Sequence, residues 1–268
     1  MKATQEYYFP FGEKLKKVQQ ADKVPKKAFV LGVYASAVHA RWIDKTGMQK
    51  VAALAVASEP SIFWVGDNAE EIISKIKIPA ELGSLTVPTN KGMNGPSGKA
   101  LDELYLKPLG LSRDDTWLCD LLPESRVNER QKNVIEKFYN QSLNDGYDLK
   151  PASIPDFKKS ELNSPERRLE ILQELETSQA NTIILLGDLP IYWFLRFYSY
   201  HKFSKLSDFI KADSDYGQPQ ELKINGKSYH VIPFCHPRQA AGLGTFNVRW
   251  SKLHKEWLKK ISDSRLKE

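Results

Sequence analysis

The chain has 268 residues, of which 41% are hydrophobic and 27% are charged, a composition that excludes collagen-like, coiled-coil and largely disordered proteins. The 39 Lys and Arg residues exceed the 33 Asp and Glu residues, and the formal charge of +6 permits a polyanionic partner without establishing one. The two cysteines exclude a disulfide scaffold and a four-thiolate zinc or iron–sulfur site built from this chain alone. The first residues lack a signal-peptide core, and no apolar run is long enough to span a bilayer. We therefore expect a cytoplasmic protein without membrane contact.

Four short apolar runs predict strands that are covered on both faces. In chain order they are Ala28–Tyr34, Trp117–Leu122, Thr182–Leu186 and His230–Cys235. Continuous apolar character is typical of parallel strands buried between helices, and helical patterns separate these runs. We expect a three-layer α/β/α sandwich with a central, mainly parallel four-stranded sheet.

Three helices are marked by residues that favour a helix start. Ser97 is predicted to cap a helix that ends near Pro108–Gly110. Ser164-Pro165 combines a cap with proline at the first helical position, and Asn247 is predicted to cap the last helix.

Two stretches lie outside this regular pattern. Apolar runs on both sides of Glu59-Pro60-Ser61 predict a hairpin insertion around residues 48–66. The polar stretch around residues 140–162 predicts a surface connection. No linker divides the sequence, so we expect a single domain over residues 1–268.

The residues that follow the predicted strands are the candidates for chemistry, because open parallel sheets bind ligands at the carboxyl ends of their strands. Each of the segments found there includes small or polar residues. They are Gly32–Ser36, Asp120–Arg126, Gly187-Asp188 and His236–Gly242, with Gly95–Gly98 at a helix start.

The order and spacing of these segments resemble the uracil-DNA glycosylase superfamily. Gly95–Arg130 is similar to the family's glycine-containing helix start, second strand and Arg-containing loop. Asn181–Asp188 is similar to its third strand and phosphate loop, and Val231–Gly244 to its final strand and H-P-S loop. The resemblance covers roughly residues 28–36 and 95–260. It implies hydrolysis of the N-glycosidic bond of a base flipped out of DNA, with no metal or other cofactor.

The resemblance implies two catalytic residues. His236 donates a hydrogen bond to the departing base, whose carbonyl gains negative charge, and Asp120 contacts the base edge.

The same resemblance implies residues that bind the nucleotide and its phosphates, and we expect a monomer acting on single- or double-stranded DNA. The predicted substrate-binding residues are Gly32, Val33, Tyr34 and Ser36. The predicted DNA-binding residues are Ser97, Arg126, Gly187, Arg238 and Gln239.

Three positions depart from the family's pattern. The family's first motif carries Asp, Asn or Glu to place or activate the attacking water, whereas this chain has Val33, and Tyr34 with an ordinary pKa of about 10 is a poor base. Asp120 stands where the family commonly has Asn, and an ionised carboxylate accepts hydrogen bonds only, so it repels a uracil carbonyl. Asp188 suits a phosphate less well than the family's Ser does.

Other functions and roles stay open. The chain is alternatively a DNA-binding member that has lost catalysis, or a small-molecule hydrolase on the same α/β plan. A positive surface around the pocket favours DNA, and a neutral or closed mouth favours a small molecule.

The two candidate catalytic residues also have structural alternatives. His236 alternatively ends an ordinary turn, and Asp120 alternatively caps a loop. Cys119 and Cys235 next to these residues suggest a zinc set, but the missing C-x-x-C spacing argues against it.

Overall fold

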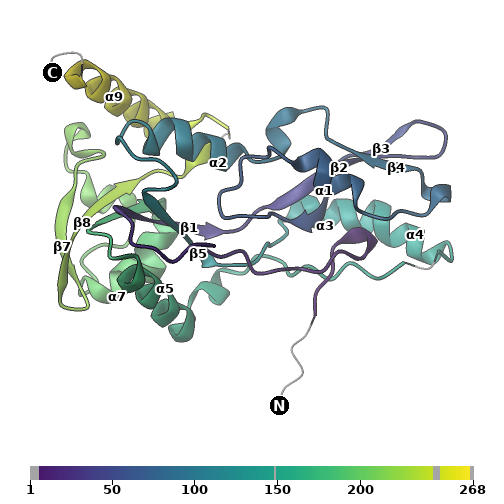
Figure 1. Cartoon of the computed structure of the whole chain (residues 1–268), viewed down its shortest axis with the longest axis horizontal. Helices are drawn as coiled ribbons and strands as arrows, with labels where there is room; N and C mark the ends of the chain where they lie inside the picture. The colour runs from purple at the N-terminus through teal and green to yellow at the C-terminus, as the bar shows by residue number, and fades with distance from the viewer. Residues whose placement is uncertain (1–5, 148, 244–247, 266–268) are drawn as a thin grey trace. The chain divides into compact units, whose positions relative to one another are not determined.

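The computed structural model describes residues 6–147, 149–243 and 248–265 (Figure 1). The chain divides into two compact units, each of which is made from three separate stretches of sequence. Unit 1 consists of Met1–Val18, Tyr34–Pro96 and Pro123–Glu161, and unit 2 consists of Gln19–Val33, Ser97–Leu122 and Leu162–Glu268. The single domain over residues 1–268 stays a prediction.

Unit 2 is built on a five-stranded sheet in the order β5-β1-β6-β8-β7. The strands are β1 (Ala28–Tyr34), β5 (Thr116–Leu122), β6 (Thr182–Leu186), β7 (Gln220–Ile224) and β8 (Lys227–Phe234). β6 pairs in parallel with both β1 and β8, and β7 is antiparallel to β8. All four predicted strands are confirmed as neighbours in one sheet, and their apolar runs form its buried centre.

The sheet has five strands rather than the predicted four, because β7 adds an antiparallel edge to β8. Its sequence QELKI alternates between polar and apolar residues, and only Ile224 is fully buried. Asn225 and Gly226 connect the two strands, and both have positive φ angles, 49° and 81°. Two consecutive residues with positive φ form a tight turn whose twist matches that of the two strands of a hairpin.

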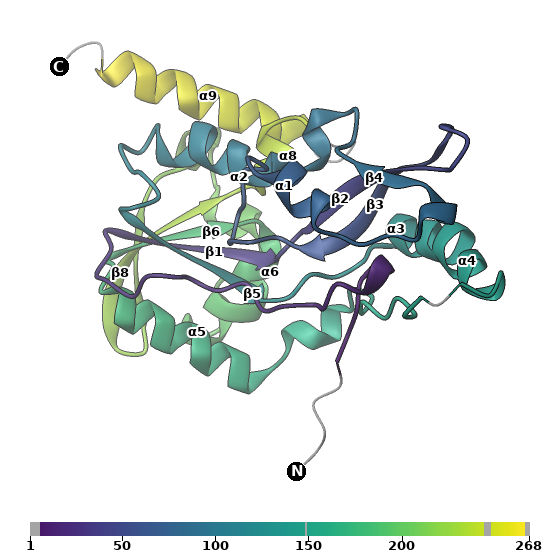
Figure 2. The same cartoon turned by 45° about the vertical axis from the view of Figure 1, so that its right-hand side comes forward.

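Helices cover both faces of this sheet, in agreement with the predicted α/β/α layers. Figure 2 shows α2 and α9 on one side and α5 on the other, and α7 lies beside α5 in Figure 1. The helices of unit 2 are α2 (Pro96–Leu101), α5 (Pro165–Ser178), α6 (Asp188–Pro190), α7 (Arg196–Tyr198), α8 (Pro237–Ala240) and α9 (Val248–Arg265). π-helical turns extend α2 and join α6 to α7. Among the described helices, none combines the length and apolar character that crossing a bilayer requires.

The predicted helix starts have different outcomes. Ser164 is confirmed as the cap of α5, because its hydroxyl accepts a hydrogen bond from the Arg167 N–H at 3.1 Å. Ser97 lies inside the first turn of α2 rather than before it, because the helix begins at Pro96. Asn247 lies outside the described residues.

Unit 1 contains a three-stranded sheet in the order β3-β2-β4. Its elements are β2 (Ala37–Ile43), β3 (Gln49–Ser58), β4 (Ser84–Thr86), α1 (Ala69–Ser74), α3 (Glu129–Val134) and α4 (Asn140–Asn144). α1 packs against β2 and β4, and α3 packs against β3. The core of this unit includes the fully buried Trp42, whose indole N–H donates to the Leu82 carbonyl at 2.7 Å.

The predicted hairpin around residues 48–66 is wrong in its position. β3 pairs with the preceding strand β2, and residues 59–66, all of them described, contain no strand. The apolar residues after Pro60 are buried in irregular structure, where the Trp64 indole N–H donates to Asp67 and Asn68 at 2.8 and 2.9 Å. The apolar residues of this segment therefore reflect burial and not a strand, in which apolar and polar residues would alternate.

The stretch around residues 140–162 is more closely packed than the predicted surface connection. It begins with α4, and its Ile154 is buried in the core of unit 1. Four further apolar side chains of the stretch are partly buried against the same core; they are Leu143, Tyr147, Leu149 and Ala152.

Candidate functional site

The candidate site lies at the carboxyl ends of the strands of unit 2. Leu186 of β6 is in register with Phe234 of β8, so Gly187 and His236 follow two neighbouring strands at the same edge. The Asp115 carbonyl, just before β5, accepts hydrogen bonds from the N–H groups of Lys27 and Ala28 at 2.8 and 3.2 Å. β5 and β1 therefore start together and run in parallel, which places Asp120 at the same edge as the end of β1.

His236 is a neutral imidazole that keeps one ring nitrogen as a donor. Its Nδ1 accepts a hydrogen bond from the backbone N–H of Arg238 at 3.3 Å, and the backbone N–H of His236 donates to Gln239 Oε1 at 3.2 Å. Burial, with a smaller effect of the Arg238 charge, lowers the pKa of His236 to about 4. An accepting Nδ1 on a neutral ring puts the proton on Nε2. Nε2 has no hydrogen-bond partner in the described part of the chain.

Polar contacts behind His236 hold the preceding residue in place. The Cys235 N–H donates to Tyr216 Oη at 3.2 Å, and Tyr216 Oη lies 2.8 Å from His254 Nδ1. His254 Nε2 lies 2.9 Å from the Leu104 carbonyl, which only accepts, so this nitrogen carries the proton. Burial lowers the pKa of the fully buried His254 to about 4, so its Nδ1 accepts from Tyr216. No local pattern signals this contact, since His254 lies within a helix of ordinary amphipathic pattern.

Asp120 is a buried carboxyl group that no hydrogen bond reaches in the described residues. Only 4% of the residue is exposed, and its Oδ1 is entirely enclosed without a partner. Burial raises the pKa of Asp120 to about 7, the nearby charge of Arg167 opposing this effect and that of Glu174 adding to it. A carboxyl group with this pKa is present in both protonation states near neutral pH.

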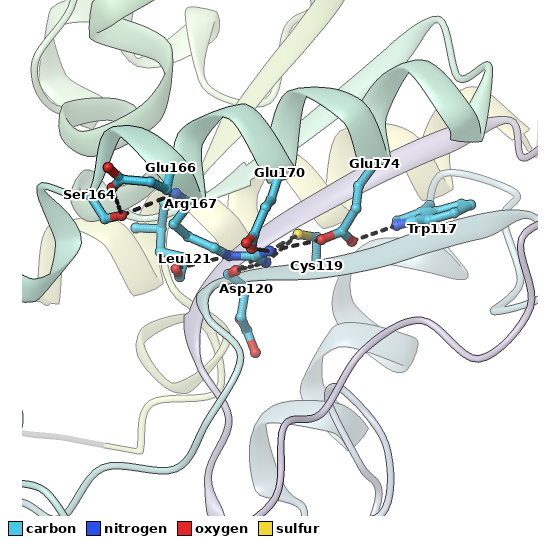
Figure 3. A network of polar contacts seen from close by, with 9 residues as sticks. All are labelled: Trp117, Cys119, Asp120, Leu121, Ser164, Glu166, Arg167, Glu170 and Glu174. Atoms are coloured by element: carbon cyan, nitrogen blue, oxygen red, sulfur yellow. Dashed lines mark hydrogen bonds and ion pairs between the residues drawn. The ribbon is translucent and has the colours of Figure 1, made fainter. Parts of the chain in front are cut away.

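A network on the other face of β5 fixes the backbone of Asp120 (Figure 3). The Arg167 guanidinium donates to the carbonyls of Asp120 and Leu121 at 2.7 and 3.3 Å. It also forms ion pairs with Glu170 and Glu174, both at 3.0 Å. Figure 3 shows the Asp120 carboxyl group pointing away from this network. Arg167 thus positions the end of β5 without contacting the carboxylate, and sequence reasoning missed it because it lies in a helix far along the chain.

Gly187 adjoins His236 at the end of β6, and the phosphate contact expected of backbone N–H groups near it stays a prediction. Its φ of 94° is in the region that favours glycine, and a Cβ placed there would lie 3.7 Å from the His236 Cβ. Its N–H donates to the Phe234 carbonyl at 2.8 Å, so this atom is already used within the sheet edge. The neighbouring Asp188 carboxylate accepts from the Leu206 N–H at 2.8 Å, which explains an acidic residue here without a ligand.

The other predicted residues of unit 2 lie close to the strand ends or at a helix start. Gly32 is buried and Val33 is half-buried near the end of β1. Ser97 is half-buried in the first turn of α2. Arg238 is exposed in α8, whereas the side chain of Gln239 is used in capping His236.

Three predicted site residues belong to unit 1. The Tyr34 ring packs 5.0 Å from the Phe157 ring, and Ser36 is exposed. The Arg126 side chain is 9% exposed, and its guanidinium pairs with Glu161 at 2.8 Å and with Glu124 at 3.4 Å. These carboxylates neutralise Arg126 and use its Nε and Nη1 donors, so its predicted role as a phosphate contact stays a prediction.

The described residues contain no group of three or more His, Cys, Asp or Glu side chains that could hold a metal ion. Cys119 and Cys235 are free and buried, and burial raises the pKa of both thiols.

No family model matches this chain, and no curated protein matches its sequence.

Proposed function

We propose that this chain is a uracil-DNA-glycosylase-like protein that removes a base from DNA by hydrolysis of its N-glycosidic bond. The observation that carries the proposal is the neutral His236, whose Nε2–H is left as a donor at the sheet edge that also bears the unpartnered Asp120. The strand order β5-β1-β6-β8 supports it, because it brings the segments of the resemblance to one edge.

The proposed reaction breaks the bond between the sugar C1′ and the base nitrogen. The bonding electrons leave with the base, and His236 Nε2–H donates to the base carbonyl that gains the charge. Water then adds its hydroxyl to C1′, and its remaining proton neutralises the base. Removing one such donor typically slows an enzyme about 10²–10³-fold.

Asp120 has the position and the protonation behaviour to select the base. The protonated carboxyl group donates and accepts, which suits the N–H and carbonyl of a uracil edge. The ionised group only accepts, which suits an amino-bearing edge. Because burial raises the pKa of Asp120 to about 7, both forms are present at neutral pH, and the preferred base changes with pH.

A second candidate function is DNA binding without excision. It is favoured by Val33, an apolar residue where the family carries the group that places or activates the water. In this case the donor of His236 recognises a base and no bond is broken.

Single-turnover excision on oligonucleotides that carry different damaged bases separates the two functions. We expect excision by the native chain and a loss of at least about 10²-fold in His236→Ala. His230→Ala is the matched control, because His230 is an exposed residue of β8, the strand that precedes His236, and lies away from its carboxyl end. Binding of these oligonucleotides without excision of any base would favour the second candidate, and equal activity of His236→Ala and the native chain would exclude the proposed role of His236.

A further inference from the structure

Unit 2 has an exposed surface on which aromatic rings and cations alternate. We call it the aromatic-basic surface, and it consists of Arg168 of α5 with Tyr192, Arg196, Phe197, Tyr200 and His201. The exposed fractions of Tyr192, Phe197 and Tyr200 are 37%, 41% and 95%. Aromatic side chains are mostly buried in folded proteins, so three exposed rings within nine residues need an explanation.

Two arginines lie against the rings of this surface. The Arg168 guanidinium is 3.9 Å from the centroid of the Phe197 ring, and the Arg196 guanidinium is 4.6 Å from that of Tyr192. Within the described chain neither arginine forms an ion pair, although Arg168 donates to Asn163 at 3.2 Å. Among the residues that the structure describes, no carboxylate lies within ion-pair distance of either guanidinium, and the Arg168 charge acts on Glu166 only as a minor influence on its pKa.

The segment that carries the surface is uniformly basic. Residues 189–207 include Arg196, Lys202 and Lys205 and contain no Asp or Glu. This local excess of positive charge is complementary to a polyanion.

Backbone conformation also sets Tyr200 and His201 apart. Both have positive φ angles, 51° and 60°, directly after α7, where helices usually place glycine or asparagine. The Tyr200 ring makes no hydrogen bond or ring contact with any described residue, so packing does not account for a tyrosine at this strained position. Residues held in such conformations without a structural benefit are frequent at functional positions.

We propose that the aromatic-basic surface binds single-stranded DNA, whose bases stack on Tyr200 and Phe197 while Arg168, Arg196 and the neighbouring lysines contact phosphates. Proteins that bind single strands without sequence preference combine exposed rings with a positively charged groove or surface in this way. A protein partner would favour continuous apolar contact, whereas here cations separate the rings. The proposal does not depend on base excision.

Fluorescence anisotropy with a labelled oligothymidylate of about 12 nucleotides, added to the full chain, tests the proposal. Tyr200→Asn removes the ring but accepts a positive φ, so it should unfold at no lower temperature than the native chain. We expect this variant to bind about 5- to 100-fold more weakly, and the control Tyr200→Phe, which keeps the ring, to bind within about twofold of the native chain. Phe197→Leu should also weaken binding.

Two further measurements separate stacking from charge. An abasic oligonucleotide of equal length and charge should bind more weakly than the oligothymidylate, and Tyr200→Asn should not change its affinity. Arg196→Gln should reduce the slope of log affinity against log salt by about 0.7, the contribution of one phosphate contact on a single strand. Lys259→Gln, which removes an exposed charge of α9, should leave the slope unchanged.

Equal affinity of Tyr200→Asn and the native chain for the oligothymidylate would overturn the proposal, as would an abasic oligonucleotide that binds equally well. The native chain is also sedimented with anionic lipid vesicles. If Tyr200→Asn no longer sediments with the vesicles but keeps its affinity for the oligothymidylate, the surface binds a membrane and the proposal is overturned. These experiments measure binding and not excision of uracil. A chain that excises no base can therefore still pass or fail this test.

Discussion

Replacing Asp120 by Asn is expected to stabilise the protein in a manner that depends on pH. Burial raises the pKa of Asp120 from 3.8 to about 7, so the folded chain holds this proton more tightly than the unfolded chain does. The sign follows from this difference: the carboxyl group is tolerated in its protonated form at low pH, and stability falls as pH rises from about 4 to about 7. Above that range the charged group is buried without a hydrogen bond.

The size of the effect follows from the same difference in pKa. At about 1.4 kcal/mol for each pH unit, a rise from 3.8 to about 7 corresponds to about 4 kcal/mol of lost stability above pH 7. Asn has the same shape and no charge, so Asp120→Asn should recover most of this stability above pH 7 and little of it below pH 4.

Urea unfolding of the native chain and of Asp120→Asn between about pH 4 and pH 9 measures the effect on stability. Single-turnover excision of uracil, over the pH range in which both proteins stay folded, measures the effect on activity. Native activity on uracil should fall as pH rises through about 7, because the ionised carboxylate repels the uracil carbonyl, while Asp120→Asn should keep its activity. A stability difference that does not change with pH, or robust native activity at pH 9 that Asp120→Asn reduces, would refute the reasoning.

Three other predictions follow from individual contacts. Arg238→Gln should weaken DNA binding and reduce the slope of log affinity against log salt by about one phosphate contact, as measured by anisotropy titrations at several salt concentrations; an unchanged slope would exclude a phosphate contact. Arg167→Met should lower the free energy of unfolding by about 3–5 kcal/mol in urea titrations, because the carbonyls of Asp120 and Leu121 and the Glu174 carboxylate lose the Arg167 guanidinium. The control Arg168→Met should change the free energy of unfolding by less than about 0.5 kcal/mol. Because burial lowers the pKa of His254 to about 4, the free energy of unfolding should be unaffected by this group above pH 6.5 and should fall by about 3 kcal/mol as pH drops to about 4. His254→Gln should remove this part of the pH dependence, and an unaltered profile would contradict the assignment.

The sheet could largely be predicted from the sequence, because its central strands are buried on both faces and their residues are continuously apolar. β7 was missed because an edge strand needs only one buried face, and QELKI has no apolar run. Its signal was the Asn225-Gly226 pair, which is typical of a tight hairpin turn. The hairpin of unit 1 was misplaced because buried irregular residues such as Trp64 have the same apolar character as a strand.

The candidate site could be predicted only in part. Asp120 lies near the end of one apolar strand and His236 follows another, so their shared edge could be inferred from local pattern and the resemblance. The partners that position them could not be, since Arg167 and His254 come from helices distant in sequence and carry no local signal. The use of the Gly187 N–H within the sheet edge depends on strand register, which no short pattern specifies.

The division of the chain into two units has a consequence for how it is made on the ribosome. Each unit takes its residues from three separated stretches, so neither can be excised as a continuous fragment. Unit 1 has all of its residues once Glu161 has been synthesised, whereas unit 2 still needs β6, β7 and β8, which follow later. β1 and β5 are neighbours and can pair with each other early, but the other edge of β1 stays unpaired until β6 has been synthesised. An exposed apolar strand edge is a site at which a nascent chain can aggregate.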